Sequence, residues 1–87
     1  MFTVYVLTNP AGRLYVGQTR DLTRRLVEHR GGLAGWTTRR GPWKLVLHET
    51  FATRGQAMQR ERVLKSGRGR RWLREELRDT TSLPGAE

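Results

Sequence analysis

The stretch FTVYVLTNPAGRLYVGQ (residues 2–18) decides the fold, because two strand-like segments flank a turn. Residues 2–8 alternate in side-chain direction and are rich in β-branched and aromatic types, which favour a strand. Residues 9–12 read NPAG, a composition typical of a turn, and residues 13–18 again have strand character. The sequence therefore predicts an antiparallel β-hairpin at the start of the chain.

The two tyrosines of this hairpin are predicted to lie together. If the turn is centred on Pro10, Tyr5 and Tyr15 pair across the two strands. Residues opposite each other on antiparallel strands project from the same side of a sheet. We therefore expect both hydroxyl groups on one face, either as ordinary cross-strand packing or as part of a site.

A helix and a third strand are predicted after the hairpin. Residues 21–30 (DLTRRLVEHR) form a helix that ends at two glycines, and residues 33–42 form a loop rich in Gly and Arg. Residues 43–51 alternate in character, which indicates a further strand. The residues expected to face the core are Leu22, Leu26 and Val27 on the helix and Trp43, Leu45, Leu47 and Phe51 on the strand.

Two more helices are predicted towards the C-terminus. Residues 53–67 begin with a capping-box pattern and end at a glycine, and residues 70–77 form the last helix. The resulting order β-β-α-β-α-α predicts an α+β fold, in which helices flank a small three-stranded antiparallel sheet. We expect one domain over residues 1–79 and a flexible tail over residues 80–87. The apolar positions of the two helices are Ala57, Met58, Val63, Leu64, Trp72, Leu73 and Leu77.

The composition favours a polyanionic partner. Seventeen Lys and Arg side chains against eight Asp and Glu give a formal net charge of +9, and the sequence pI is about 11.6. Such an excess steers a protein towards phosphate backbones and gains affinity from counterion release. An arginine-rich host and simple solubility are the alternative explanation of the same charge.

Several classes of protein are excluded or disfavoured by what the sequence lacks. It has no cysteine, which excludes disulfides, thiolate metal sites and a cysteine nucleophile. No apolar run approaches the roughly 20 residues of a membrane helix, so no membrane partner is expected. The first residues, MFTVYVLTN, have neither a basic leader nor a small-residue cleavage site, which favours a cytoplasmic location over secretion.

The first predicted helix carries polar groups in a regular pattern. Asp21, Arg25 and His29 recur every four residues, so they share one face of the helix. This face follows directly after Tyr15 and Gly17, and the strand end and the helix would then line one concavity. The alternative is an exposed Asp21–Arg25 ion pair beside a surface histidine.

Glu61 interrupts the apolar stripe of its helix. It lies four residues after Ala57 and three before Leu64, where a carboxylate is costly unless it is paired or binds a metal. Arg54 or another arginine would satisfy it, and so would a divalent ion. Since few other carboxylates are placed to help, a metal here would be held by one carboxylate, water and substrate phosphate, an arrangement that suits Mg²⁺.

Four short motifs, taken in order, resemble those of the GIY-YIG nuclease superfamily. TVY (3–5) is a variant of G-I-Y, and YVG (15–17) is a conservative form of Y-I-G. TRDLTRRLVEH (19–29) is similar to the D-L-x-x-R-x-x-x-H helix of that family. ATRGQAMQRERVLKSGRGRRWL (52–73) is similar to the E-A-x-x-R-E-x-x-L-K helix of its small stand-alone members, so the resemblance covers nearly the whole chain.

The resemblance implies phosphodiester cleavage with one divalent ion, Mg²⁺ or Mn²⁺. By position, Tyr5 would contact or deprotonate the attacking water, and Tyr15 would lie near the nucleophile. Arg25 would stabilise the charge that grows on the phosphate, and His29 would assist proton transfer or orient the phosphate. Glu61 would be the metal ligand, which would account for a carboxylate on an apolar helix face.

Basic residues outside the motifs are expected to bind the phosphate backbone without reading bases. Arg24 neighbours the motif arginine but points about 100° away from it on a helix. Others lie in the predicted loop, at the start of the third strand and at the junction of the last two helices. The full set is Arg24, Arg39, Arg40, Lys44, Arg68 and Arg70.

The substrate implied by the resemblance is DNA rather than RNA, in repair or recombination. No separate DNA-binding segment is expected within the 87 residues, which favours cleavage directed by DNA structure, by a single strand or by a protein partner. Thr3 replaces the glycine of the first motif. That departure motivates a second hypothesis, a non-catalytic nucleic-acid-binding module. The charge alone permits a third, an adaptor that binds an acidic protein.

Overall fold

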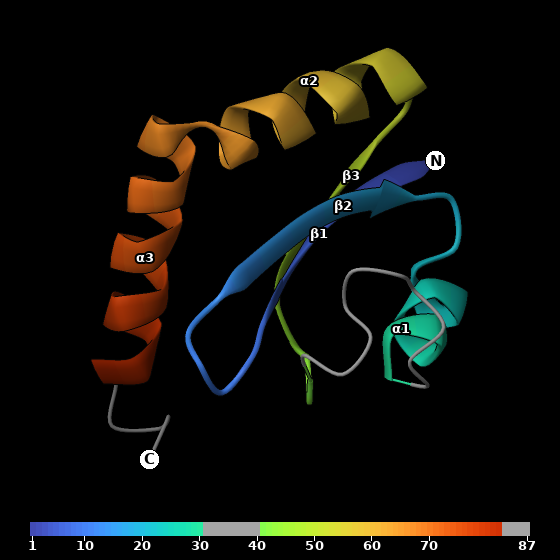
Figure 1. Cartoon of the computed structure of the whole chain (residues 1–87). Helices are drawn as coiled ribbons and strands as arrows, with labels where there is room; N and C mark the ends of the chain where they lie inside the picture. Colours follow the sequence, from blue (N-terminus) through green and yellow to red (C-terminus); the bar gives the residue numbers. More distant parts are fainter. Residues whose placement is uncertain (31–40, 83–87) are drawn as a thin grey trace.

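The computed structural model describes residues 1–30 and 41–82, and it confirms the predicted order of elements. A hairpin and a helix are followed by a third strand and two further helices, so the predicted α+β fold is confirmed (Figure 1). The elements are β1 (Phe2–Thr8), β2 (Leu14–Thr19), α1 (Leu22–Arg30), β3 (Lys44–Phe51), α2 (Arg54–Lys65) and α3 (Gly67–Ser82). Among the described residues, no helix has the length and apolar character needed to cross a membrane.

The sheet is antiparallel and has the strand order β2-β1-β3, so β1 lies in the middle. Tyr5 pairs with Gly17, and Leu7 pairs with Tyr15, so the predicted Tyr5–Tyr15 pairing is wrong by two residues. A shift of two residues leaves every side chain on its original face. Both tyrosines therefore still project from the same side, as diagonal neighbours with ring centroids 6.2 Å apart.

The hairpin turn explains this register. Gly12 adopts a φ of 80°, which favours glycine, and its N–H donates to the carbonyl oxygen of Asn9 at 2.9 Å. The backbone N–H of Arg13 donates to the Asn9 side chain at 2.8 Å. These contacts centre the turn on residue 11 instead of Pro10, and a turn moved by one residue shifts the pairing by two.

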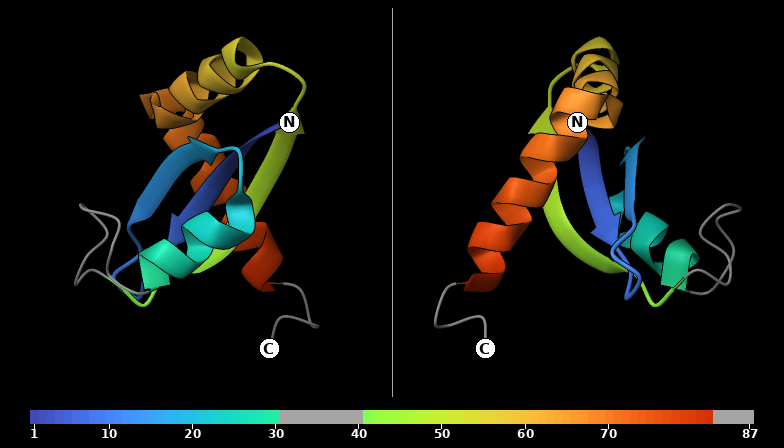
Figure 2. Two further views of the ribbon diagram at one scale, coloured as in Figure 1. Left: turned by 90° about the vertical axis from the view of Figure 1, so that its right-hand side faces the viewer. Right: turned by 60° about the vertical axis from the view of Figure 1, so that its left-hand side comes forward.

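The two faces of the sheet carry separate apolar clusters. α2 and α3 cover one face, and α1 lies against the other (Figure 2). β1 supplies both clusters, because its side chains alternate between the faces and are nearly all buried. The cluster under α2 and α3 consists of Val4, Val6, Val16, Ala57, Leu64 and Leu73. The cluster under α1 consists of Tyr5, Leu7 and Trp43, with Tyr15, Leu22, Leu26 and Leu45 packed against it.

The third strand does not keep one apolar face along its whole length, as the alternation predicted. Leu45 pairs with Leu7 and packs on the α1 side, whereas Leu47 pairs with Val6 and packs under α2. A β-bulge between Val6 and Leu7 is the cause, because one extra residue on β3 switches the side of everything beyond it. The bulge lets a single strand contribute to both clusters.

Some apolar helix residues lie outside the predicted core. A helix on a sheet buries a stripe only about 100° wide, so apolar residues on the flanks of that stripe stay in solvent. Ala57, Leu64 and Leu73 are buried as predicted. The residues that are exposed instead are Val27, Met58, Val63 and Trp72.

Ser66 both ends α2 and begins α3. Its N–H and its hydroxyl donate to the carbonyl oxygen of Val63, and its hydroxyl oxygen accepts the N–H of Gly69 at 3.1 Å. α3 therefore starts three residues earlier than predicted, at Gly67, and continues to Ser82, into the segment predicted as a tail. The crossing is close: a Cβ on Gly69 would overlap the Val63 carbonyl.

Candidate functional site

Four side chains from three elements meet on the α1 face of the sheet. Tyr5 comes from β1, Tyr15 from β2, and Arg25 and His29 from α1. The Tyr5 hydroxyl and His29 Nε2 are 2.9 Å apart, and Arg25 Nε donates to the Tyr5 oxygen at 3.4 Å. The His29 ring lies edge-on to both tyrosines, with ring centroids 5.6 Å from Tyr5 and 5.0 Å from Tyr15. The structure thus brings these four residues together between the two strands and the helix.

The local structure of α1 places Arg25 and His29. The Asp21 carboxylate accepts the N–H of Arg24 at 3.1 Å, so it caps the helix and sets its first turn. His29 lies one turn beyond Arg25 and is only 3 % exposed. The alternative expectation of an Asp21–Arg25 pair beside a surface histidine is therefore wrong, because Arg25 pairs with Glu28 and His29 is buried under the tyrosines.

Burial keeps the phenol and the imidazole of this cluster uncharged. Desolvation raises the pKa of Tyr5 to about 12, against the opposing effect of its hydrogen bond with Arg25. Desolvation and then the nearby Arg25 charge lower the pKa of His29 from its ordinary value. At neutral pH the phenol is protonated and the imidazole is neutral, so the Tyr5–His29 hydrogen bond joins two uncharged groups, while Arg25 donates to the Tyr5 oxygen.

Gly17 leaves the space that Tyr5 occupies. A Cβ on Gly17 would lie 2.7 Å from the Tyr5 hydroxyl oxygen, 2.9 Å from Cζ of Tyr5 and 3.1 Å from Cε1 of Tyr15. These distances are shorter than van der Waals contact, so any side chain here would push the Tyr5 ring away. The glycine of the second motif is therefore needed for the position of the first-motif tyrosine.

Glu28 is a site residue that sequence reasoning missed. It binds Arg25 Nη1 at 3.0 Å and approaches Arg24 Nε at 3.9 Å. Hydrogen bonds with Tyr5 and then Glu28 raise the pKa of Arg25 further above its ordinary value, while 35 % of the Arg25 side chain stays exposed. The i, i+3 spacing from Arg25 was the available signal. A cavity of about 380 Å³ beside them is lined by Gln18, Thr19, Arg20, Asp21, Arg24, Arg25 and Glu28.

Glu61 lies on α2, which packs against the other face of the sheet. Its carboxylate pairs with Lys65 Nζ at 2.6 Å, so a lysine one turn on, and not Arg54, is its cationic partner. Arg60 binds Glu49 of β3 through two hydrogen bonds of 2.7 and 3.3 Å, which fixes that flank of α2 over β3. Arg60 and Glu61 lie about 50° to either side of the buried stripe, so Glu61 faces β2.

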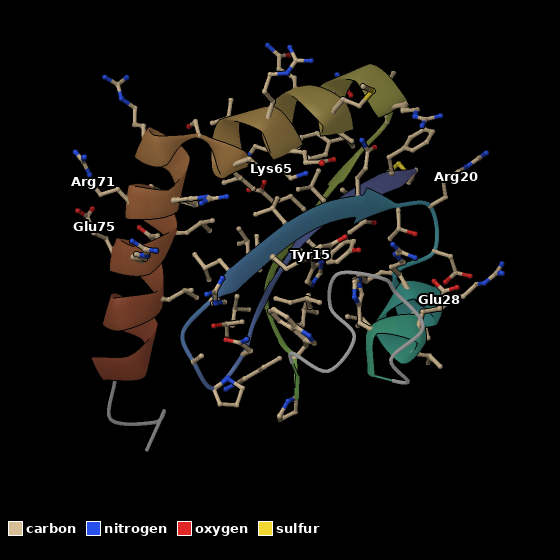
Figure 3. The ribbon with its side chains drawn as sticks, viewed as in Figure 1. Tyr15, Arg20, Glu28, Lys65, Arg71 and Glu75 are labelled. Carbon is tan, nitrogen blue, oxygen red and sulfur yellow. The ribbon has the colours of Figure 1, made fainter. Side chains whose placement is uncertain are left out.

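β2 is an edge strand, and this matters for Glu61. Groups on opposite faces of a sheet are separated by the sheet itself, except at its edge. Glu61 lies on the α2 side of the sheet, whereas Tyr15 lies on the edge strand β2 with its ring on the α1 side. Lys65 lies between α2 and β2, with Tyr15 below it (Figure 3).

The donors available for a metal ion are few. Within residues 1–30 and 41–82, no three His, Cys, Asp or Glu side chains gather closely enough to hold one. Glu61 therefore fits only a site with a single carboxylate, completed by water and substrate phosphate, and Lys65 holds one of its two oxygens. Its role as a metal ligand stays a prediction.

The basic residues predicted to bind phosphate do not form one floor. Arg24 is 79 % exposed on α1, and Lys44 is exposed at the start of β3. Arg68 and Arg70 are exposed on α3, which covers the opposite face from α1. Arg39 and Arg40 lie outside the described residues.

The pKa shift of His29 predicts acid-sensitive stability. Its folded pKa lies below the unfolded value of about 6.5, so stability is complete above that value and is lost as the pH falls towards the folded pKa. We expect the free energy of unfolding to fall by up to about 1.4 kcal/mol at pH 5.5 relative to pH 7.5. Urea unfolding at both values will measure this.

The second histidine provides a matched control for this pH dependence. His48 is exposed on β3, so His48→Gln should keep the loss at pH 5.5, whereas His29→Gln should remove it. An equal loss in wild type and His29→Gln would contradict the prediction.

Comparison with known proteins agrees with this geometry. The model of the GIY-YIG catalytic domain matches residues 1–74. A UPF0213 protein of Bacillus pumilus is 46 % identical over 63 residues, which is 71 % of this chain and 64 % of that protein, so less than two thirds of that relative is matched. A UPF0213 protein of Natronomonas pharaonis is 44 % identical over 64 residues, covering 72 % of this chain and 75 % of that one.

A solved structure is also similar. The solution NMR structure of a UPF0213 protein from Bacillus halodurans has a TM-score of 0.53 and 33 % sequence identity, and the match covers 99 % of this chain and 92 % of that one. The matched range covers most of the chain, and Tyr5, Tyr15, Arg25, His29 and Glu61 lie within it. This chain belongs to the GIY-YIG catalytic-domain family.

Proposed function

We propose that this chain is an endonuclease that hydrolyses phosphodiester bonds in DNA with the help of Mg²⁺ or Mn²⁺. The observation that carries the proposal is the Arg25 guanidinium, which is half-exposed beside a cavity and held by both Tyr5 and Glu28. A fixed, permanently charged fork suits the charge that grows on a phosphate under attack. Membership of the GIY-YIG family supports the same class of reaction.

The proposed substrate is a DNA structure or single strand rather than a sequence, in repair or recombination in the cytoplasm. The net charge of +9 supports a nucleic-acid partner, and arginine contacts to phosphate carry no sequence information. A protein partner would supply any further choice of target.

Exposure suggests how the water loses its proton. Tyr15 and Arg25 remain partly exposed, whereas Tyr5 and His29 are buried. The water that attacks the phosphate is therefore held at Tyr15 and Arg25, which solvent can reach. Its proton moves to Tyr15 as Tyr15 passes one to Tyr5 and Tyr5 passes one to His29 Nε2. Each tyrosine gains and loses one proton, so no phenolate forms, which the raised pKa of Tyr5 would oppose.

Attack on the phosphate forms one bond to phosphorus and breaks another. The hydroxide oxygen bonds to phosphorus, the bond from phosphorus to the leaving oxygen breaks, and the leaving oxygen takes a proton from solvent. His29 releases the proton it gained to solvent, which its lowered pKa favours. Arg25 stabilises the extra negative charge on the phosphate throughout. A divalent ion held by Glu61 would neutralise charge on the same phosphate.

Replacing Glu61 with glutamine tests the metal role. We expect cleavage to fall at least about 100-fold, because a neutral amide is a poor ligand for a divalent ion, and we expect Mn²⁺ affinity measured by calorimetry to fall with it. Glu75→Gln is the control, since Glu75 points away from the sheet on α3 (Figure 3). Cleavage and Mn²⁺ binding unchanged by Glu61→Gln would sink the metal assignment.

A second candidate function is a nucleic-acid-binding module without turnover. The ion pair between Glu61 and Lys65 favours it, because the ammonium group already satisfies the carboxylate. This candidate predicts salt-sensitive DNA binding that EDTA does not change. Metal-dependent cleavage by the wild type that is lost in Glu61→Gln would exclude it.

A further inference from the structure

A second cavity, lined by three arginines, lies between the hairpin turn and α3. Its volume is about 340 Å³, close to that of the cavity beside Arg25. It takes residues from two segments far apart in the sequence, which have no part in the proposed chemistry. The lining residues are Ala11, Gly12, Arg13, Leu14, Arg70 and Arg74.

The fold holds these arginines in place. Arg70 and Arg74 lie one turn apart, so they share a flank of α3, and the buried Leu73 anchors that helix on the sheet. The close packing of α3 on α2 at Gly69 sets where this flank lies. The turn at Gly12 brings Arg13 to the opposite wall.

Within the part of the chain that the structure describes, no carboxylate compensates the charge in this cavity. Arg13, Arg70 and Arg74 form no ion pair with any carboxylate in the described part of the chain, whereas Arg24, Arg25 and Arg60 each have a glutamate partner. Three guanidinium groups around one hollow repel each other unless an anion lies between them. Guanidinium forks match phosphate oxygens in shape and hydrogen bonding.

The arginine cavity and the cavity beside Arg25 lie along the same strand. Leu14 lines the first, and Gln18, four positions further along β2, lines the second, a distance of about 13 Å of extended chain. β2 is the edge strand and runs in front of β1 from the side of α3 towards the side of α1 (Figure 1). A bound strand that follows β2 could therefore place different phosphates of its backbone in the two cavities.

We propose that Arg13, Arg70 and Arg74 form a second phosphate site, which holds the backbone of the bound nucleic acid at a distance from the bond that is cut. The strand runs along the β2 edge, past the Glu61–Lys65 pair. This inference rests on nucleic-acid binding in the proposed function but not on cleavage. The site fixes the direction of the strand, and it contacts no base.

Fluorescence anisotropy with a labelled 20-nucleotide DNA strand in EDTA tests the site without cleavage. The double substitution Arg70→Gln/Arg74→Gln should weaken binding about tenfold and lower the slope of log affinity against log salt by about 1. Arg71→Gln is the control for loss of one positive charge from the same helix, because Arg71 points away from the sheet (Figure 3). It should change affinity less than about twofold.

Each outcome decides the question. Equal affinities for the double variant and Arg71→Gln overturn the site, although the proposed function stands if the wild type still cleaves. Failure of the wild type to bind DNA overturns both. A loss of polyglutamate binding as large as the loss of DNA binding shows a general cationic patch and overturns the phosphate assignment. If the double variant fails to fold, Arg13→Gln tests the other wall by the same measurement.

Discussion

Replacing Arg25 with alanine is expected to lower the rate of DNA cleavage about 1,000-fold while leaving the fold intact. Positively charged groups that meet growing phosphate charge contribute effects of this order. The expected cost in stability is small, because the partner, Glu28, is itself 29 % exposed and can be solvated. Single-turnover cleavage with wild-type and variant protein, together with thermal unfolding of both, will measure the two effects separately.

Arg24 provides the control for this experiment. It is the preceding residue, with the same charge and the same neighbouring glutamate, but it is 79 % exposed and its pair with Glu28 is longer, at 3.9 Å. Arg24→Ala should weaken substrate binding a few-fold and leave the rate at saturating DNA unchanged. Equal losses of rate in the two variants, or a loss below tenfold for Arg25→Ala, would show that position 25 has no special role. Arg25→Lys should also fail, since an ammonium group cannot donate to Tyr5 and Glu28 from one planar fork.

Adding a single methyl group at Gly17 is expected to damage both stability and activity. The Cβ of Gly17→Ala would lie 2.7 Å from the Tyr5 hydroxyl, so the ring must move and its bond to His29 is lost. We expect a loss of about 1–3 kcal/mol in the free energy of unfolding, as for overpacking elsewhere. A displaced catalytic group commonly costs about 100-fold in rate, and cleavage assays should show a fall of that size.

Two variants separate crowding from the ordinary effect of changing a glycine. Gly55→Ala makes the same change on α2, where a Cβ would have no neighbour within 4 Å, and it should be neutral or slightly stabilising. Tyr5→Phe in the Gly17→Ala background removes the closest contact, so stability should recover in part and cleavage should not. A Gly17→Ala protein as stable and active as wild type would refute this account of the second motif.

The sequence predicted the strands and helices well because their signals are local. Alternation in the hairpin and the capping box at Thr53 each depend on neighbours a few residues apart, and the capping box is confirmed in full. The hairpin register required the φ of Gly12, and the two-sided β3 required a bulge set by its pairing with β1. Those are properties of paired strands, which alternation along one strand does not report.

The site was predictable as a set of residues but not as a network. Spacing placed Arg25 and His29 on one face of α1, yet an apolar pattern put Val27 in the core, where the structure buries His29. The imidazole is accepted there because the Tyr5 hydroxyl satisfies it, and that partner lies 24 residues away in the chain. Glu28 was missed for the same reason. It matters because Tyr5, which is distant in the sequence, binds the same Arg25 guanidinium, so that the two residues together hold it in place.

The central place of β1 has a consequence for motion. A strand hydrogen-bonded on both sides exposes its amides only when the whole sheet opens, so β1 should exchange hydrogen through global unfolding. Tyr5 is carried by that strand, whereas Arg25 and His29 are carried by a helix of nine residues that packs against one face. The tyrosine is therefore the fixed reference of the site, and α1 is the element whose local opening would release the guanidinium and the imidazole together.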